Sequence, residues 1–279
     1  MVEPQDAAGG GTAWILPPGL PRAALVTGAG VRLGRAIALA LADAGFAIGL
    51  HCRDSVRPAE SLRREIEEKG GRAVILRADL AAEAETEQLV DRATAALGPL
   101  GILVNNASAF ERDEWHDADR DSWDRHLEPN LRAPFVLMQR FARQLPDTLP
   151  DGTRAEGVVL NMLDQRVWSL TPHFVSYTVS KSALWTLTRS MALALAPRIR
   201  VNGIGPGPAI RSARQTPEQF ERQCASTPLG RGTDPDEVAR AAMLLLSLPS
   251  VTGQMLALDG GQHLQWHAAP AGGQDEAVE

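Results

Sequence analysis

From Arg22 onward, short apolar segments alternate with longer segments in which apolar residues recur at helical spacing. The first apolar segment, Ala23 to Thr27, is followed by a glycine-containing turn and then by a helical pattern from Leu33 to Ala44, which ends at Gly45. Strands that alternate with helices form a parallel sheet covered by helices on both faces. The sequence therefore predicts a single α/β domain built on a doubly wound parallel sheet.

The same alternation continues through the rest of the chain, without internal repeats. Further strands are predicted at 46–51, 73–77, 101–105, 157–162, 199–204 and 254–258, and further helices at 57–69, 84–97, 121–145, 177–196 and 237–248. Pro134 lies inside the longest helix and is expected to bend it. Residues 1–20, rich in Gly, Ala and Pro, are expected to form a disordered arm, 21–266 the domain, and 267–279 a loose tail.

Composition excludes several classes of function. The net charge of −6 over 279 residues argues against a surface that binds nucleic acid or an anionic membrane. No apolar run approaches the ~20 residues that cross a bilayer, and the N-terminus lacks a basic and then apolar signal. Cys52 and Cys224 lie far apart, with no spacing typical of a metal site or a disulfide framework. We expect a soluble cytoplasmic enzyme without a metal.

The turn after the first strand has the composition of a phosphate-binding loop. It reads TGAGVRLG from Thr27 to Gly34, so that glycines and the start of a helix follow a buried strand. Glycines let the backbone approach a pyrophosphate, and a helix N-terminus offers free N–H groups and a positive dipole. A tight turn alone would explain Gly28 and Gly34. The complete strand–turn–helix context favours a dinucleotide, with Gly28, Arg32 and Leu33 in contact with it.

The end of the second predicted strand is where such a fold distinguishes NAD from NADP. An acidic residue there would bind the ribose 2′-hydroxyl of NAD, but this chain has Cys52 followed by Arg53. A guanidinium binds a 2′-phosphate well, so NADP(H) is the expected cofactor, although Asp54 partly offsets Arg53. Asp79 either accepts a hydrogen bond from the adenine or caps the next helix, and these two readings stay open.

A tyrosine and a lysine four residues apart form the candidate catalytic centre. Tyr177, the one tyrosine of the chain, and Lys181 share a helix face, and Asp164 precedes the tyrosine by 13 residues, at the end of a strand. A lysine ammonium beside a phenol favours the phenolate and lowers the pKa of the phenol, as an acid–base catalyst requires. Taken alone, the pair is more often a half-buried tyrosine beside a surface lysine.

Five motifs, in order, make residues 22 to 265 resemble the short-chain dehydrogenase/reductase family, which has a Rossmann-like fold. They are the TGxxxRxG turn, Asn105-Asn-Ala-Ser108, Asn130, Tyr177-xxx-Lys181 and Pro206-Gly207. The resemblance implies that the tyrosine is the catalytic acid, that the lysine holds the nicotinamide ribose and lowers the pKa of the tyrosine, and that the asparagine binds a water in a proton relay. It also implies a homotetramer.

Departures from the general family pattern resemble its pteridine reductase branch. Asp164 replaces the usual serine, Ser108 follows Asn-Asn-Ala, and Phe110 comes two residues later. The branch implies that Asp164 and Tyr177 handle protons, that Arg32 and Ser108 contact cofactor phosphate and pterin, and that Phe110 stacks on the pterin ring. From the residues alone, Phe110 would more often be a core or rim residue and Asp164 a turn residue.

The predicted site combines catalytic residues, cofactor contacts and substrate contacts. The catalytic residues are Asp164, Tyr177, Lys181 and Asn130; the cofactor contacts are Gly28, Arg32, Leu33, His51, Arg53, Asp79, Leu80, Asn106, Ala107, Ser108, Tyr177, Lys181, Pro206 and Gly207; the substrate contacts are Arg32, Ser108, Phe110, Asp164 and Tyr177. His51 ends a strand, where a histidine is usually structural.

The expected activity is NADPH-dependent reduction of a C=N bond in a dihydropterin or dihydrofolate. Hydride goes to carbon and a proton to nitrogen, and a carboxyl group bonded to a phenol can relay that proton, whereas a serine is a poor acid. Two alternatives remain: a carbonyl reductase acting on a 3-oxoacyl thioester or a sugar ketone, and a non-catalytic NADPH sensor. The loop 211–228, which closes over substrate in the family, resembles no fixed template.

Overall fold

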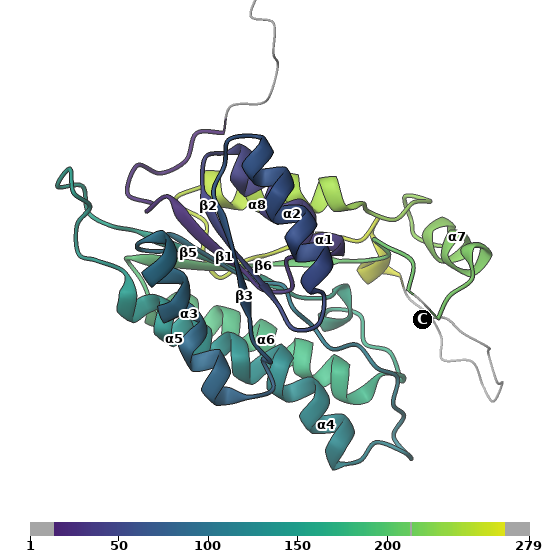
Figure 1. Ribbon diagram of the computed structural model, residues 1–279. Coiled ribbons are helices and arrows are strands. Elements are labelled where there is room, and N and C mark those ends of the chain that lie inside the picture. Colours follow the sequence, from purple (N-terminus) through teal and green to yellow (C-terminus); the bar gives the residue numbers. More distant parts are fainter. Residues whose placement is uncertain (1–13, 213, 266–279) are drawn as a thin grey trace, which may run out of the picture.

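The computed structural model describes residues 14–212 and 214–265, and these form one α/β unit (Figure 1). Its sheet has seven strands in the order β3-β2-β1-β4-β5-β6-β7, and every neighbouring pair is parallel. The strands are β1 (Ala23–Val26), β2 (Ala47–Cys52), β3 (Ala73–Arg77), β4 (Ile102–Asn105), β5 (Gly157–Met162), β6 (Ile199–Pro206) and β7 (Met255–Leu258). The predicted fold class is confirmed.

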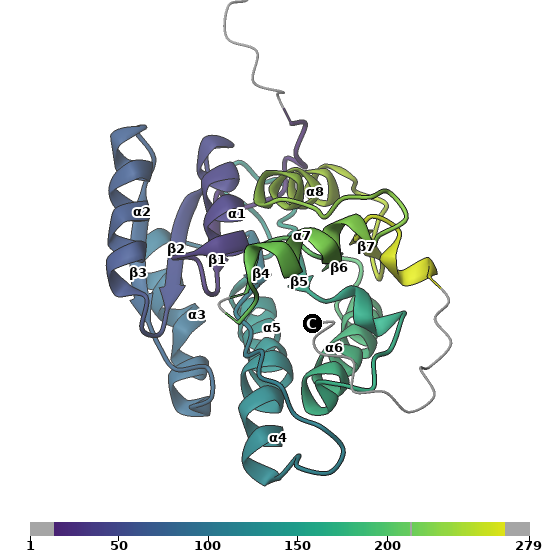
Figure 2. The ribbon, with the colours of Figure 1, turned by 90° about the vertical axis from the view of Figure 1, so that its right-hand side faces the viewer.

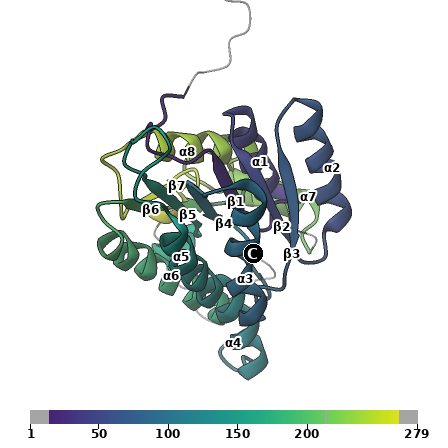
Figure 3. The ribbon, with the colours of Figure 1, turned by 60° about the vertical axis from the view of Figure 1, so that its left-hand side comes forward.

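Helices cover both faces of the sheet (Figure 3). One face packs against α1 (Arg32–Asp43), α2 (Val56–Glu68) and α8 (Pro235–Ser247). The other packs against α3 (Glu83–Leu97), α5 (Ala133–Gln144) and α6 (Val175–Ala194). No helix of the described ranges is long and apolar enough to cross a membrane.

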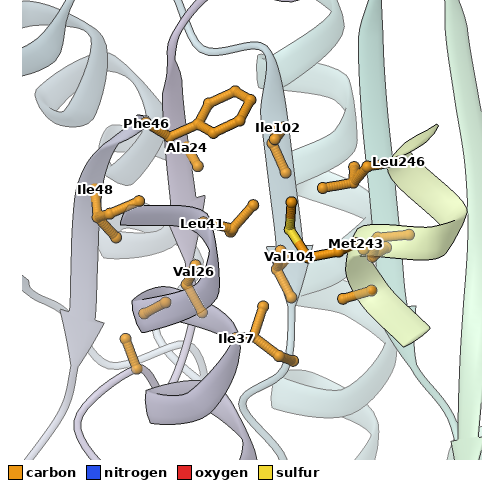
Figure 4. Close-up of a cluster of buried hydrophobic side chains, with 14 of the residues drawn as sticks. Ala24, Val26, Ile37, Leu41, Phe46, Ile48, Ile102, Val104, Met243 and Leu246 are labelled. Carbon is orange, nitrogen blue, oxygen red and sulfur yellow. The ribbon is translucent and has the colours of Figure 1, made fainter. Parts of the chain in front are cut away.

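The core explains why the strands read as nearly continuous apolar runs. Each strand of a doubly covered sheet is buried on both faces, so both sets of alternating side chains are apolar. On the face of α1 and α8, Leu41 and Met243 pack with Val26 and Val104 of the two central strands (Figure 4). All four side chains are at most 2% exposed. These contacts fix the sheet and therefore the positions of the strand ends.

The predicted helix 121–145 is interrupted. The chain forms α4 (Arg120–Leu127), a π-helical turn η1 (Glu128–Arg132) and then α5. Pro129 and Pro134 each lack the N–H that an α-helix needs at that position, and the wider turn between them accommodates both. Asn130 therefore lies on a π turn, not on a regular helix, and its side chain is buried.

Two other expectations need correction. Residues 14–20 do not belong to a disordered arm, because Leu20 is 1% exposed and Trp14 and Leu16 pack against the core. Residues 1–13 and 266–279 lie outside the described residues. The loop 211–228 contains a helix, α7 (Pro217–Ala225), which begins with a capping box between Thr216 and Gln219. The Thr216-Pro-Glu-Gln219 pattern in the sequence is the signal for this helix start.

Candidate active site

A cleft of about 990 Å³ lies at the carboxyl ends of the central strands. In an open parallel sheet this is the edge at which ligands bind, where the order of the strands reverses between β1 and β4. Helix α7, which contributes Phe220 and Gln223 to the lining, lies in front of these strand ends in Figure 2. The strand ends, the turn before α1 and helix α7 together enclose the cleft.

The cleft brings together all the predicted cofactor and substrate contacts. Its lining includes Gly28, Arg32, Leu33, His51, Arg53, Asp79, Leu80, Asn106, Ala107, Ser108, Phe110, Asp164, Tyr177, Lys181, Pro206 and Gly207. The fourth catalytic candidate, Asn130, is 1% exposed and lies behind this lining.

The turn before α1 has the geometry of an anion-binding loop. Gly28 has a φ of +62°, a conformation that glycine adopts without strain. A Cβ on Gly34 would lie 2.3 Å from the Gly28 carbonyl oxygen, so no larger residue fits there. No side chain caps the N-terminus of α1, and Val31, Arg32 and Leu33 at this end line the cleft. Uncapped amides and the helix dipole are suited to a phosphate.

The Asn-Asn-Ala segment supports this turn from the neighbouring strand. Asn106 donates from its side chain to the carbonyl oxygens of Thr27 (2.8 Å) and Gly28 (3.2 Å). The backbone N–H groups of Asn106 and Ala107 donate to the Thr27 hydroxyl at 2.9 and 3.0 Å. The segment thus locks the end of β4 to the turn after β1.

Arg32 ties the turn to the chain after β6. Its Nη1 and Nη2 donate to the carbonyl oxygens of Arg211 (3.2 Å) and Ile210 (3.0 Å). Its φ of +54° lies in the left-handed region, which is unusual for a residue with a side chain. A guanidinium has five N–H donors, so Arg32 retains donors for a ligand in the cleft.

The end of β2 is basic and lacks a carboxylate at the position of Cys52. Arg53 is exposed and pairs with Asp54 at 2.7 Å, a hydrogen bond that raises the pKa of Arg53. His51 is buried, accepts the Gly28 N–H on Nδ1 and contacts the Ala78 carbonyl through Nε2. Burial lowers the pKa of His51, so the neutral ring joins β2 to both neighbours, as a structural histidine does.

Asp79 makes a hydrogen bond within the turn that precedes α3. Its Oδ1 accepts the N–H of Ala81 at 2.9 Å, in the turn that leads into α3, whose N-cap residue is Ala82. The N-cap residue of α3 accepts no side-chain hydrogen bond, so the prediction that Asp79 caps this helix is wrong. Asp79 lines the cleft, and its contact with the adenine stays a prediction.

At the catalytic centre, the hydroxyl of Tyr177 donates to Oδ2 of Asp164 at 2.8 Å. Tyr177 is 6% exposed. Burial first, and the charge of Asp164 second, raise the pKa of Tyr177 well above its usual value. The expectation that Lys181 lowers the pKa of this tyrosine is wrong for this arrangement, because the buried phenol already donates to a carboxylate.

Lys181 lies on the same helix face, with Nζ 5.8 Å from the centroid of the Tyr177 ring. Its Nζ donates to the Met162 carbonyl oxygen at 2.8 Å. Burial lowers the pKa of Lys181 to about 8, while the nearby Asp164 opposes that shift. The lysine therefore titrates near neutrality.

Asn130 fastens the loop that carries Phe110. Its Oδ1 accepts the Ala109 N–H at 2.8 Å, and its Nδ2 donates to the Ala109 carbonyl at 3.0 Å and to the Ser180 hydroxyl at 3.1 Å. This side chain bonds π turn, loop and α6 together. Its role in a proton relay stays a prediction.

Phe110 belongs to an aromatic group beside the tyrosine. Its ring stacks on that of Phe174 with centroids 4.7 Å apart and an interplanar angle of 6°, and it meets the Tyr177 ring edge-on at 4.7 Å. Phe110 lines the cleft, and Phe174 is buried. The ring is thus held rigidly where a flat ligand can stack.

Sequence reasoning missed further charged residues at the cleft, among them Arg166, Arg214 and Glu111. Arg166 contacts Asp164, and Arg214 donates to the Phe110 carbonyl at 3.3 Å and pairs with Glu111. The Arg214 contacts join segments about a hundred positions apart in the chain, and no local pattern signals such a pairing. Asp164 is two residues from Arg166, but the spacing alone does not show which way either side chain points.

The chain is similar to known proteins in sequence and in fold. A family model described as enoyl-(acyl carrier protein) reductase, from the short-chain dehydrogenase/reductase family, matches residues 28–263. The 7alpha-hydroxysteroid dehydrogenase of Escherichia coli K12 is 33% identical over 246 residues, which cover 86% of this chain and 93% of that protein.

Two crystal structures are also similar, both of a FolM alternative dihydrofolate reductase 1 in complex with NADP. The Brucella suis protein is 45% identical with a TM-score of 0.83, over 88% of this chain and 96% of its own. The Brucella canis protein is 43% identical with a TM-score of 0.84, over 91% and 98%. By the family model, the sequence identity and the shared fold, the chain belongs to the short-chain dehydrogenase/reductase family.

Proposed function

We propose that this oxidoreductase is an NADPH-dependent reductase of a C=N bond in a dihydropterin or dihydrofolate. The observation that carries the proposal is the hydrogen bond from Tyr177 to Asp164. Most members of the family have a serine at this position, which orients a carbonyl oxygen. A carboxyl group bonded to a phenol instead provides a site for moving a proton onto a ring nitrogen.

The residues at the cleft fit a phosphorylated nicotinamide dinucleotide. The uncapped N-terminus of α1 and the tight Gly28 turn suit the pyrophosphate. Cys52 leaves the end of β2 without a carboxylate that would repel a 2′-phosphate, and Arg53 is exposed next to it. Both similar Brucella structures were determined with NADP. When bound, the cofactor supplies the hydride for the carbon of the C=N bond.

The chain itself supplies the proton. The raised pKa of Tyr177 keeps its phenol protonated at neutral pH, so it can donate to the substrate nitrogen that receives the electron pair of the C=N bond. Asp164 accepts from the same phenol and itself lines the cleft. Lys181, charged below a pH of about 8, offsets the negative charge that develops on the phenol oxygen.

Phe110 gives the site a preference for flat rings. Because it is stacked on buried Phe174, its ring loses little freedom when a ligand binds. Stacking between aromatic rings contributes about 1 kcal/mol beyond the burial of apolar area. Arg32 and Ser108 line the same cleft and offer polar contacts to a heterocycle.

A carbonyl reductase is the second candidate, and the 33% identity with a hydroxysteroid dehydrogenase favours it. Asp164 in place of a serine argues against it. The test is NADPH oxidation, followed by absorbance, with dihydrobiopterin, dihydrofolate, a steroid ketone and a 3-oxoacyl thioester. We expect turnover of a dihydropterin or dihydrofolate at a kcat/KM well above that of the ketones. Turnover of the ketones alone would exclude the pterin assignment.

We also propose a homotetramer. A mostly apolar surface groove of about 330 Å³ joins the π-helical region to α6, and it is lined by Leu127, Glu128, Leu131, Arg132, Phe135 and Leu187. Pairing of such faces across two-fold axes would bury these side chains. Light scattering coupled to size-exclusion chromatography gives the mass directly, and a monomer would refute the assembly.

A further inference from the structure

Arg166 holds both oxygens of the Asp164 carboxylate. The backbone N–H of Arg166 donates to Oδ1 at 2.8 Å, and its Nη1 donates to Oδ2 at 3.3 Å. Oδ2 is also the acceptor of the Tyr177 hydroxyl. One residue, through its main chain and its side chain, therefore fixes the plane of the carboxylate that meets the catalytic phenol.

The guanidinium is enclosed, unlike those of most surface ion pairs. The side chains of Arg166 and Asp164 are only 13% and 14% exposed. The Cζ atom of Arg166 lies 5.4 Å from the Phe110 ring centroid and 5.3 Å from that of Phe174. These nearly equal distances place the guanidinium alongside the stacked pair. Pairs at this depth interact more strongly than exposed ones, and aromatic neighbours limit the rotamers of the arginine.

The charges around the phenol show what the arginine compensates. Asp164 and Arg166 face Tyr177 from the segment after β5, Lys181 from its own helix, and the His126 ring from α4 at 5.9 Å. Burial lowers the pKa of His126, so its ring is neutral at neutral pH. The charge of Arg166 lowers the pKa of Tyr177. Burial and the charge of Asp164 raise this pKa by more, so the net shift is upward.

A second negative charge arises beside Asp164 during the proposed reaction. When the proton leaves the phenol for the substrate nitrogen, phenolate and carboxylate lie at hydrogen-bonding distance with no proton between them. Two negative charges at this distance repel each other strongly in a site with little water. A fixed cation next to the pair reduces this cost without having to reorganise.

We propose that Arg166 is a positioning residue of the active site. It orients the Asp164 carboxylate toward Tyr177 and balances the negative charge that develops there on proton transfer. This role rests on the proposed function for its catalytic consequence, whereas the arrangement of the three residues does not depend on the substrate.

The kinetic test compares three variants. In Arg166→Gln we expect kcat to fall by about 10- to 100-fold, less than the ~10²- to 10⁴-fold that a direct acid–base group contributes, with an unchanged Kd for NADPH. The basic limb of its pH profile should move to higher pH, and Arg166→Lys, which keeps the charge, should recover part of kcat. Arg189→Gln is the control, because it removes the same charge from an exposed position on α6 near Trp185. A wild-type kcat and pH profile in Arg166→Gln would overturn the proposal.

A second measurement needs no substrate. The chain contains one tyrosine, so the ultraviolet absorbance of tyrosinate reports Tyr177 alone. In Asp164→Asn the phenol should ionise at lower pH than in the wild type, because the carboxylate that opposes its ionisation is gone. Adding Arg166→Gln to that variant should shift the ionisation upward by about one pH unit, tenfold in proton affinity. Circular dichroism checks that Asp164→Asn and the double variant are both folded. If their tyrosine titrations are then identical, the charge of Arg166 does not act on Tyr177, and the proposal is refuted.

The two proposals can fail separately. If the wild-type enzyme reduces no dihydropterin or dihydrofolate, the proposed function falls. The tyrosine titration still decides whether Arg166 acts on the phenol, since it depends on neither substrate nor turnover.

Discussion

The hydroxyl of Tyr177 lies 2.8 Å from Oδ2 of Asp164, although one residue lies in the first turn of a helix and the other in the segment after a strand. Strand β5 ends just before Asp164, and α6 packs back across β6, which lies beside β5. This return places Tyr177 directly over the carboxylate. The contact is therefore a consequence of the sheet topology, and it makes the carboxylate the first residue to test.

Replacing Asp164 should separate chemistry from cofactor binding. Asp164→Asn removes the charge but keeps the shape, and we expect kcat for a dihydropterin to fall by about 10²- to 10⁴-fold. The Kd for NADPH, measured by fluorescence, should stay within about twofold of the wild-type value, because Asp164 lies away from the phosphate turn. A kcat that survives the substitution would remove the carboxylate from the mechanism.

The charge of Lys181 predicts a pH dependence. Burial lowers its pKa to about 8, so the charged fraction falls as pH rises through that value. The phenol stays protonated over the same range because the pKa of Tyr177 is raised. We therefore expect kcat for reduction to decline above a pH of about 8. In Lys181→Arg the cation persists to higher pH, and a decline at the same pH in that variant would contradict the assignment.

Arg53 should determine the preference for NADPH over NADH. Its guanidinium is exposed and can exchange Asp54 for a 2′-phosphate. Hydrogen bonds to charged groups contribute about 1.5–3 kcal/mol, so Arg53→Ala should raise the KM for NADPH by about 10- to 100-fold. The KM for NADH should change little. Arg57→Ala, an exposed arginine at the start of α2, is the matched control. An equal change in the KM for NADPH and for NADH would show that Arg53 does not bind the 2′-phosphate.

The contact between Arg214 and Glu111 should hold the 211–228 segment over the substrate. The side chains of Arg214 and Glu111 are 41% and 49% exposed, so the ion pair contributes only about 0–1 kcal/mol to stability. We expect Arg214→Glu to raise the KM for the pterin by about two- to fivefold with kcat nearly unchanged. Adding Glu111→Arg should restore the KM, because the exchanged pair re-forms. If the double variant is worse than either single one, the contact has another role.

Gly34 should be irreplaceable for the phosphate turn. A Cβ there would lie 2.3 Å from the Gly28 carbonyl oxygen and 2.5 Å from Asn106 Nδ2. Gly34→Ala should lower the free energy of unfolding by about 1–3 kcal/mol, as overpacking does, and should weaken NADPH binding. Denaturant unfolding and a fluorescence titration measure the two effects.

Gly45→Ala is the control for that variant. Its φ is +86°, and nothing lies within 4 Å of the added Cβ, so the expected cost is the backbone strain of about 1 kcal/mol. NADPH affinity should remain that of the wild type. Weakened binding in Gly45→Ala as well would show that stability, not the turn, governs the affinity.

The sequence by itself determined the sheet, because burial on both faces forces strands to be apolar and helices to be amphipathic. It also determined which segments end at the cleft, since Gly28, Asn106, Asp164 and Pro206 all follow or end parallel strands and must share one edge. These are consequences of local pattern and of chain direction, which require no knowledge of long-range contacts.

Only the tertiary structure decided the electrostatics and the loop contacts. The pKa of Tyr177 rises although Lys181 shares its helix face, because burial and the Asp164 charge raise it. The π turn, the Arg214 contact and the enclosure of Arg166 by Phe110 and Phe174 likewise depend on groups brought together by folding. Coulomb and desolvation energies vary with distance and depth, and a sequence pattern records neither.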